Sequence, residues 1–484
     1  MNRRHFLKTA ACAALTTLGC SEWFKRKQPN ILFIFADDQA FDTINALGYT
    51  DVQTPNLDRL VRNGVTFTHA YNMGAWHGAV CVASRTMLNT GRFLWEARDL
   101  EPELQSEQEE GRFWSQMMKN AGYETYMSGK WHVKDIDPQN IFDHVRDVRP
   151  GMPRDFFDWN NPAAHHLGYD RPVEGQADEW SPYDKSMGGY WNGGTHWSEV
   201  LGNHAVDFID MAAASENPFF MYLAFNAPHD PRQSPKDYVE KYPLDTVPVP
   251  ENFQPLYPYK DHIGCGPDLR DERLAPFPRT EYAVQVHRQE YYAIITHMDA
   301  QVGRILDALE ASGKAKETFI FFTADHGLAC GRHGLMGKQN MYDHSVRVPL
   351  FVNGPRIPKD ITLNTPVYLQ DIMPTVLDLA GASKPEHVDF NSLMPIITGK
   401  KEKQYDLIYG GYMELQRMVC DGEFKMIVYP AINKTILYNL EKDPLEMNDL
   451  AGDPQYEKKI EELRSKLTDL QQKLGDPLVT NKAL

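Results

Sequence analysis

Carboxylates, imidazoles and an ammonium group follow four separate apolar segments of the sequence, at the point where each segment ends. The four polar stretches are Asp37-Asp38, Gly129-Lys130-Trp131-His132, Asn226-Ala227-Pro228-His229 and Asp325-His326-Gly327. Taken alone, each stretch could be a loop start, a helix cap or a surface charge. Because ligands of open α/β sheets bind outside the carboxyl ends of the strands, the four together predict one site at one edge of a sheet.

Three of these carboxylates and one imidazole form a candidate metal site. Asp37, Asp38 and Asp325 would supply hard oxygen ligands, and His326 would be a further ligand. Oxygen ligands of this kind are preferred by Ca²⁺ and Mg²⁺. The imidazole is in mild tension with that assignment, since nitrogen ligands favour transition metals. We expect Ca²⁺, with Mg²⁺ as the alternative.

The most specific pattern in the chain is a twelve-residue motif. It reads Cys81-Val82-Ala83-Ser84-Arg85-Thr86-Met87-Leu88-Asn89-Thr90-Gly91-Arg92. This motif resembles the signature of the sulfatase family, in which the cysteine is converted to formylglycine. The resemblance extends from residue 30 to about residue 451, and it includes the late stretches Leu437-Tyr438-Asn439-Leu440 and Asp443-Pro444-Leu445-Glu446.

The resemblance implies an activity and a role for each polar stretch. The implied activity is hydrolysis of sulfuric esters. The implied metal ligands are Asp37, Asp38, Cys81, Asp325 and His326. The implied catalytic residues are Cys81, Arg85, Lys130, His132, His229 and Lys338. Ala83 stands where the family more often has Pro, which leaves open whether the maturing partner is the formylglycine-generating enzyme or a radical sulfatase-maturing enzyme.

A hydrated aldehyde at position 81 suits this chemistry better than a thiol, whose product with a sulfuryl group would be hard to turn over. One hydroxyl can attack sulfur, and the other can later expel sulfate by re-forming the carbonyl. A bound cation would lower the pKa of the attacking hydroxyl. His229, with Lys338, would protonate the departing sugar oxygen, and His132 would take the proton of the second hydroxyl.

Local structure around the motif would help to bind an anion. If a helix begins at Cys81 and ends near Gly91, its N-terminus adds favourable partial charge. Arg85 would then lie one turn away, on the same side as residue 81. The ordinary alternatives are a buried inert thiol at Cys81 and a solvated loop lysine at Lys338.

The sequence patterns of the strands and helices that must position these residues predict an α/β fold. Residues 30–36, 123–128, 218–225 and 318–324 are almost continuously apolar, which is typical of parallel strands covered on both faces. Helical patterns lie between them, at residues 55–63 and 290–312, and Thr54 is expected as the N-cap of the first. The resemblance implies an alkaline-phosphatase-like fold, with a large, mostly parallel central sheet flanked by helices.

The pattern changes after Thr365. Residues 372–380 predict a helix, and short alternating segments over residues 405–439 predict an antiparallel sheet with a turn at Asp421-Gly422. An amphipathic helix over residues 456–474 follows. We therefore predict a catalytic domain of residues 28–395 and a smaller C-terminal α+β subdomain of residues 396–484.

The first twenty residues predict an export signal. Arg3-Arg4 precede an apolar run that is too short to span a membrane, which resembles the twin-arginine pattern; an ordinary secretory signal is the alternative. The stretch before Cys20 resembles a lipoprotein processing site, but Thr17 stands where Leu is usual, so a lipid anchor is left open. We expect an exported, periplasmic protein.

Composition narrows the class of protein. The 484 residues are 42% apolar and 24% charged, which excludes a disordered or fibrous chain. A formal charge of −16 makes a nucleic-acid-binding surface improbable. The six cysteines contain no CxxC pair, so neither a disulfide framework nor a structural zinc site is indicated.

Two long connecting segments, residues 135–197 and 233–288, would supply substrate contacts. His77 and Arg232 are further candidates because they flank catalytic positions. We expect a sulfated oligosaccharide substrate, from a glycosaminoglycan or an algal polysaccharide. The alternatives are a phosphodiester or phosphonate monoester hydrolase of the same superfamily and a carbohydrate-binding lipoprotein with an inactive site. Asp325-His326 and the stretch PHDPRQSPKDY resemble iduronate-type 2-sulfatases more than arylsulfatases.

Overall fold

The computed structural model describes residues 28–153, 157–158, 160–161 and 164–480. The predicted export signal and Cys20 lie outside these residues. None of the helices within them combines the length and the apolar character needed to cross a membrane.

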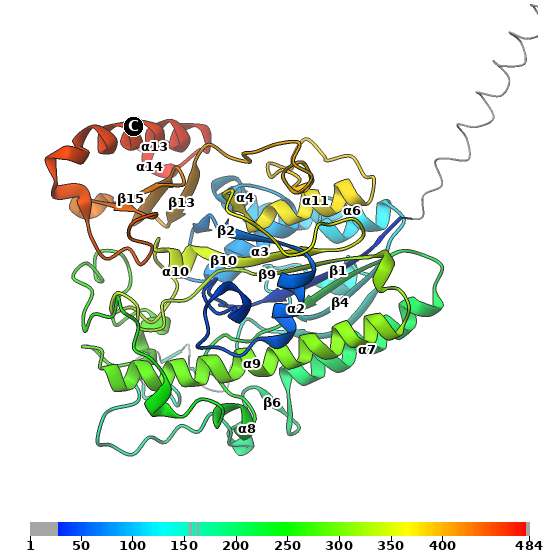
Figure 1. Ribbon diagram of the computed structural model, residues 1–484, viewed down its shortest axis with the longest axis horizontal. Coiled ribbons are helices and arrows are strands. Elements are labelled where there is room, and N and C mark those ends of the chain that lie inside the picture. Colours follow the sequence, from blue (N-terminus) through cyan, green and yellow to red (C-terminus); the bar gives the residue numbers. More distant parts are fainter. Residues whose placement is uncertain (1–27, 154–156, 159, 162–163, 481–484) are drawn as a thin grey trace, which may run out of the picture.

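A nine-stranded mixed sheet forms the centre of the molecule, and the α/β prediction is confirmed (Figure 1). Its strand order is β11-β2-β10-β9-β1-β8-β4-β5, and β12 also pairs with β2. The strands are β1 Asn30–Ala36, β2 Val65–Tyr71, β4 Glu124–Lys130, β5 His144–Arg149, β8 Phe219–Ala224, β9 Thr318–Ala324, β10 Arg347–Asn353, β11 Ile361–Leu363 and β12 Val367–Tyr368. Only β10 runs antiparallel to its neighbours, β2 and β9, so the sheet is mostly parallel, as predicted.

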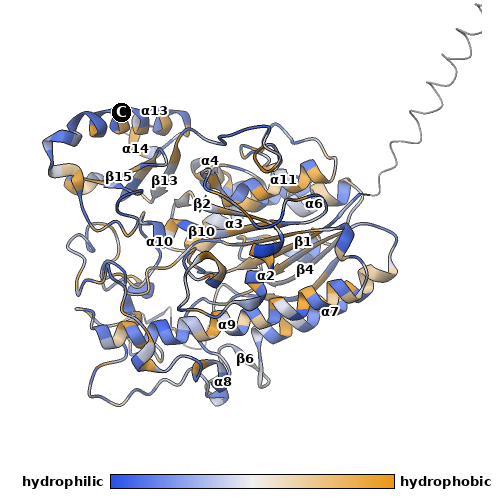
Figure 2. Cartoon of the chain, in the orientation of Figure 1, coloured by the Kyte–Doolittle hydropathy of each residue, from blue (hydrophilic) through white to orange (hydrophobic). Residues whose placement is uncertain are grey.

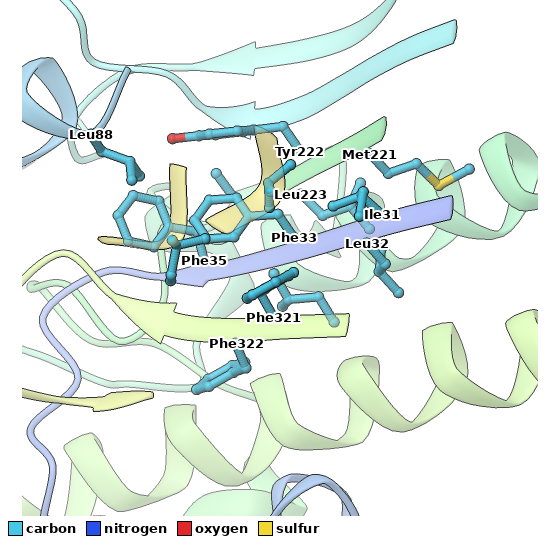
Figure 3. Close-up of a cluster of buried hydrophobic side chains, with 14 of the residues drawn as sticks. Ile31, Leu32, Phe33, Phe35, Leu88, Met221, Tyr222, Leu223, Phe321 and Phe322 are labelled. Atoms are coloured by element: carbon cyan, nitrogen blue, oxygen red, sulfur yellow. The ribbon is translucent and has the colours of Figure 1, made fainter. Parts of the chain in front are cut away.

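The central strands are buried because helices cover both faces of the sheet. All seven residues of β1 are buried, and Phe33 lies beside Tyr222 of β8 with the ring centres 5.1 Å apart. Figure 3 shows these rings together with Leu88, which comes from a helix above the sheet. In Figure 2 these strands carry much of the orange that marks hydrophobic residues. Because helices cover both faces of the sheet, the side chains on both sides of these strands are buried, and the sequence of the strands is continuously apolar.

Helices lie on both sides of the sheet (Figure 1). On one side are α2 Pro55–Asn63, α7 Trp197–Ala214 and α9 Glu281–Ala311, and on the other are α3 Val80–Thr90, α6 Trp114–Asn120 and α11 Ile372–Leu379. The shorter helices are α4 Leu94–Leu100, α5 Leu104–Glu109, α8 Lys236–Val239, α10 Asp343–Val346, α12 Met394–Ile397 and α14 Pro477–Thr480. Helix α9 begins nine residues before the predicted start, where the Thr280 side chain accepts the N–H of Ala283 at 3.1 Å.

A second sheet contains the predicted antiparallel strands and one strand from elsewhere. Its order is β16-β15-β14-β13-β3, with β13 Ile408–Tyr412, β14 Gln416–Cys420, β15 Phe424–Tyr429 and β16 Lys434–Asn439. Helix α13, Glu457–Lys473, lies beside this sheet (Figure 1). Strand β3, Gly74–Ala75, pairs with β13 in parallel and was not predicted. The proposed boundary between residues 395 and 396 stays a prediction.

The pairing of β3 with β13 requires glycine at position 74. Gly74 has a φ of +104°, and a Cβ there would lie 1.9 Å from the backbone oxygen of Gly411. We expect Gly74→Ala to lower the free energy of unfolding by roughly 2–4 kcal/mol, because it adds backbone strain and a steric clash. Urea titration followed by circular dichroism measures the change. Gly452→Ala is the control, since a Cβ at Gly452 meets nothing within 4 Å. An unchanged midpoint for Gly74→Ala would contradict this account.

Candidate active site

The four polar stretches lie together at one edge of the central sheet. Strands β9, β1, β8 and β4 are consecutive and parallel, so their carboxyl ends meet. The N–H of Asp37 donates to Ala227 O at 3.1 Å, and the N–H of Asp325 donates to Ala36 O at 3.3 Å. Lys130 is the last residue of β4, so that strand runs further than the sequence predicted.

Cys81 lies in the first turn of α3 and faces this edge. Its side chain is buried, and Sγ is 3.2 Å from His326 Nε2, 3.4 Å from Asp37 Oδ1 and 3.7 Å from Lys338 Nζ. The helix starts at Val80 and ends before Gly91, which has a left-handed φ of 74°. Both helix ends therefore agree with the sequence pattern, and the positive end of the helix dipole lies at the thiol.

Arg85 joins three of the elements that form the site. Its Nε donates to Asp325 Oδ2 at 3.0 Å, and its Nη1 donates to Lys130 O at 2.8 Å. The guanidinium also lies over the ring of Phe35, 4.6 Å from its centre. In addition, Ser84 Oγ donates to Asp325 O at 2.8 Å. Helix α3, and with it Cys81, is thereby fixed to the ends of β9 and β4.

The side chains of Asp37, Asp38, Cys81 and His326 form a buried group whose ligand atoms all lie within 4.8 Å of one another. His326 Nε2 is 3.2 Å from Asp38 Oδ1 and 3.5 Å from Asp325 Oδ1. His326 Nδ1 lies 3.0 Å from Gly327 O, a contact that leaves Nε2 toward the carboxylates. Asp325 stands beside the group and accepts the backbone N–H of Asp38 at 3.2 Å.

This donor set fits a divalent cation. Burial, and next to it the negative charge of Asp325, raises the pKa of Asp37 well above its usual value. Such crowding of buried carboxylates is relieved when a cation binds between them. Burial lowers the pKa of His326, but the negative charges of Asp325, Asp38 and Cys81 outweigh it and raise this pKa to about 9. The residues that the sequence predicted as ligands therefore suit a divalent cation.

Two lysines and a histidine complete the buried centre. Lys130 Nζ contacts Asp37 Oδ2, and Lys338 Nζ lies 2.8 and 2.9 Å from the two carboxylate oxygens of Asp38. Lys338 Nζ is also 3.2 Å from His229 Nε2. A second close group of Asp38, His229 and Asp230 contains ligand atom types as well, but the Lys338 ammonium already lies between Asp38 and His229.

Positive charges control the protonation state of the Cys81 thiol, and burial controls that of a nearby imidazole. Burial alone would raise the pKa of Cys81, but Lys130, Lys338 and His326 lower it well below its usual value. Burial lowers the pKa of His132 to about 4. His132 is therefore neutral near pH 7 and can accept a proton.

An open cleft of about 480 Å³ leads from His132 toward the solvent. Its lining residues are His77, Gly78, Ala79, Val82, Glu101, His132, Val133 and Lys134. Glu101 accepts hydrogen bonds from Trp76 Nε1 at 2.6 Å and from Lys134 Nζ at 2.8 Å. His77, predicted as a substrate contact, lies on the wall of this cleft with Nε2 3.7 Å from Glu101 Oε2. The sequence offered no signal for Glu101 or Lys134.

Arg232, the other predicted substrate contact, lies elsewhere. It is only 1% exposed, its Nε donates to Pro228 O at 3.3 Å, and its guanidinium stacks on the ring of Tyr291. It is not among the residues that line the cleft in the described part of the chain. Its contact with substrate stays a prediction.

Comparison with known proteins gives two family matches. The model of the family described as Sulfatase matches residues 29–382, and the model described as N-sulphoglucosamine sulphohydrolase, C-terminal, matches residues 331–473. A relative from Bacteroides thetaiotaomicron, an N-acetylglucosamine-6-O-sulfatase, is 24% identical, and the alignment covers 96% of this chain and 90% of the relative.

Two solved structures share the fold. One was solved with its substrate D-glucosamine-2-N,6-O-disulfate; it is 22% identical, with a TM-score of 0.69 over 93% of this chain and 99% of that one. The other is a phosphonate monoester hydrolase of Agrobacterium radiobacter, 23% identical, with a TM-score of 0.69 over 92% and 96% of the two chains. Identities this low show the fold alone.

The buried group of Asp37, Asp38, Cys81 and His326 predicts that a divalent cation stabilises the folded protein. We expect CaCl₂ to raise the melting temperature of chelator-treated protein, because a ligand at 100 times its Kd stabilises by about 2.7 kcal/mol. Asp38→Asn should abolish most of this rise. Asp307→Asn, at an exposed carboxylate, should keep it. Differential scanning calorimetry with Ca²⁺ and with Mg²⁺ makes the measurement, and a wild-type melting temperature that neither ion moves would refute the metal site.

Proposed function

Because this chain belongs to the sulfatase family and is thus a sulfuric ester hydrolase, we propose that it releases sulfate from a sulfated carbohydrate. We further propose that it uses formylglycine at position 81 and a divalent cation. The observation that carries this proposal is that the buried Cys81 Sγ contacts Asp37, His326 and Lys338 at one edge of the sheet.

The proposed cation and the proposed formylglycine would supply a positive charge and a nucleophilic hydroxyl that the unmodified side chains do not provide. Asp37, Asp38, Asp325 and His326 would hold the cation, which would add positive charge and make an attacking hydroxyl more acidic. Oxidation of Cys81 to formylglycine would provide a hydrate, with one hydroxyl to bond to sulfur and another to help expel sulfate. A maturing enzyme has to carry out that oxidation. The oxygen-rich donor set supports Ca²⁺ or Mg²⁺ as the ion.

The remaining polar side chains have separate tasks in this proposal. Lys130 and Lys338 place positive charge beside position 81, where the oxygens of a sulfate group would bind. His229, within 3.2 Å of Lys338 Nζ, shares with it the protonation of the departing oxygen. His132, neutral because of its low pKa, accepts a proton on the cleft side.

The cleft supports a carbohydrate as the leaving group. Its volume of about 480 Å³ is in the range of small-ligand sites, and its wall combines two imidazoles with an ammonium and a carboxylate. Charged groups and imidazoles bind sugar hydroxyls, and an imidazole ring can stack on a sugar ring. The B. thetaiotaomicron relative and the disulfate complex are both named for amino-sugar sulfates, which supports an oligosaccharide from a glycosaminoglycan. An algal polysaccharide is the alternative source.

A phosphonate monoester hydrolase is the second candidate, because one such enzyme has a similar fold. Sulfate and phosphonate esters have similar shapes, so the distinction has to come from turnover. Export to the periplasm also remains part of the proposal, and it rests on residues 1–20 of the sequence alone.

The test is a sulfate-release screen over defined sulfated oligosaccharides, with protein that is co-expressed with a maturing enzyme. Phosphate monoesters, phosphate diesters and phosphonate monoesters are assayed side by side. We expect sulfate esters to be turned over fastest, and a preference for phosphodiesters or phosphonates would favour the second candidate. Mass analysis of the tryptic peptide Asn63–Arg85 should show an aldehyde at position 81. An unmodified thiol in fully active protein would refute the mechanism.

Replacement of the thiol tests the nucleophile directly. We expect Cys81→Ala to lower kcat for sulfate esters by roughly 10⁴-fold or more, because no atom remains that can bond to sulfur. Cys420→Ala is the matched control, since Cys420 is a buried free cysteine in the second sheet. Its kcat should stay near that of the wild type. Substantial activity in Cys81→Ala would show that another group is the nucleophile.

Replacements in the cleft test the sugar site. We expect Lys134→Ala and His77→Ala each to raise KM for the best oligosaccharide by about tenfold, equal to 1.4 kcal/mol of binding. The KM for 4-nitrophenyl sulfate, which has no sugar hydroxyls, should change much less. Lys403→Ala serves as a control at another exposed lysine, outside the two long segments. Equal effects on both substrates would argue against sugar recognition here.

A further inference from the structure

A buried guanidinium stands behind the two side chains that we propose as proton donors. Arg270 begins a short 3-10 helix, Arg270–Leu274, within the long segment 233–288, and it is only 9% exposed. Its Nη1 donates to Asp230 Oδ2 at 2.7 Å, and its Nη2 contacts Asp271 Oδ1. One side chain thus joins two buried carboxylates.

The first of these two residues, Asp230, orients His229 mainly through its backbone oxygen, and its carboxylate lies beside the ring. The His229 Nδ1 atom is 2.7 Å from Asp230 O and 3.6 Å from Asp230 Oδ1. Tyr169 OH donates to Asp230 Oδ2 at 3.0 Å and accepts from Arg270 Nη1 at 2.9 Å. Because Nδ1 is held on this side, the opposite ring nitrogen, Nε2, faces Lys338 Nζ at 3.2 Å.

The second carboxylate stands beside Lys338. Asp271 Oδ2 is 3.6 Å from Lys338 Nζ. The next residue, Glu272, accepts the backbone N–H groups of Met336 at 3.0 Å and Gly337 at 2.9 Å. This short segment therefore holds both the ammonium group and the backbone that carries it.

Arginine is suited to this position for a geometric reason. Its planar guanidinium presents several donors in a fixed fork and can bind two carboxylates at once, whereas a lysine ammonium is a point charge. Without the guanidinium, Asp230 and Asp271 would be buried carboxylates without their main cation. They would then attract the Lys338 ammonium, which Asp38 also binds at 2.8 Å.

We propose that Arg270 is a positioning residue that acts through Asp230 and Asp271 to keep His229 Nε2 and Lys338 Nζ aimed at the departing ester oxygen. The inference rests on the proposed function and adds a task for the segment 233–288. When the sulfur–oxygen bond breaks, the departing oxygen keeps the electron pair and takes a proton from this histidine–lysine pair. A displaced pair therefore slows the loss of basic leaving groups most.

The test compares two leaving groups in the Arg270→Gln variant of the matured protein. One substrate is the oligosaccharide with the fastest sulfate release in the screen above, and the other is 4-nitrophenyl sulfate, whose phenolate leaves without a proton. Correct placement of an acid is worth about 10²–10⁴-fold, so we expect kcat for the oligosaccharide to fall about 100-fold. The kcat for 4-nitrophenyl sulfate should fall less than about fivefold, and both KM values should change little. The kcat of Arg270→Lys for the oligosaccharide should lie between that of Arg270→Gln and that of the wild type.

Arg171→Gln is the matched control. Arg171 is also a buried guanidinium held by two carboxylates, 2.8 Å from Glu290 and 2.7 Å from Asp178, and it contacts neither His229 nor Lys338 in the described interactions. Any loss that it causes should be equal for the two substrates. If Arg270→Gln fails to fold, Tyr169→Phe removes only the hydroxyl between Arg270 and Asp230, and it should show the same selective loss on a smaller scale.

The outcomes separate this inference from the proposed function. A wild-type protein that releases no sulfate from any oligosaccharide would refute the carbohydrate sulfatase proposal itself. An active wild type with equal losses on both substrates in Arg270→Gln, or in Tyr169→Phe, would overturn the positioning role alone.

Discussion

The structure depends on one constraint: each buried carboxylate at the edge of the central sheet needs a buried cation beside it. Asp37, Asp38 and Asp325 are all fully buried, and each is in contact with a buried cation: Lys130, Lys338 and Arg85, respectively. Removing one partner of such a pair costs several kcal/mol, because the other charge is left without water or a counterion. The three pairs must therefore form together, and the strands and the helix that carry them must be in place when they do.

Much of this arrangement could be predicted from the sequence, because two simple signals agree. Continuous apolar runs gave the four central strands to within one or two residues, since only strands covered on both faces look like this. Polar residues directly after those runs fall at the carboxyl edge without further assumption. The helix that carries Cys81 was also predicted, since Gly91 marks its end.

Other features could not be predicted, because they depend on contacts between distant parts of the chain. Two-residue strand β3 has no periodicity of its own and exists only through its pairing with β13. Arg270 looks like one charge among many in a long loop, and only the folded chain brings it to Asp230. The closeness of Arg232 to His229 in the sequence predicted a substrate contact, but it could not predict that the guanidinium is buried against Tyr291.

The long sequence distance between β3 and its partner β13 affects how long the Cys81 thiol stays accessible during synthesis. Strand β3 precedes Cys81 by only a few residues, and its partner, Gly411–Tyr412, leaves the ribosome long after it. Until then the nascent chain has no second sheet to fix this segment, and the N-terminal end of α3 lacks one of its anchors. In the folded chain Cys81 is 2% exposed. We infer that the oxidation proposed for this sulfur takes place before the fold is complete.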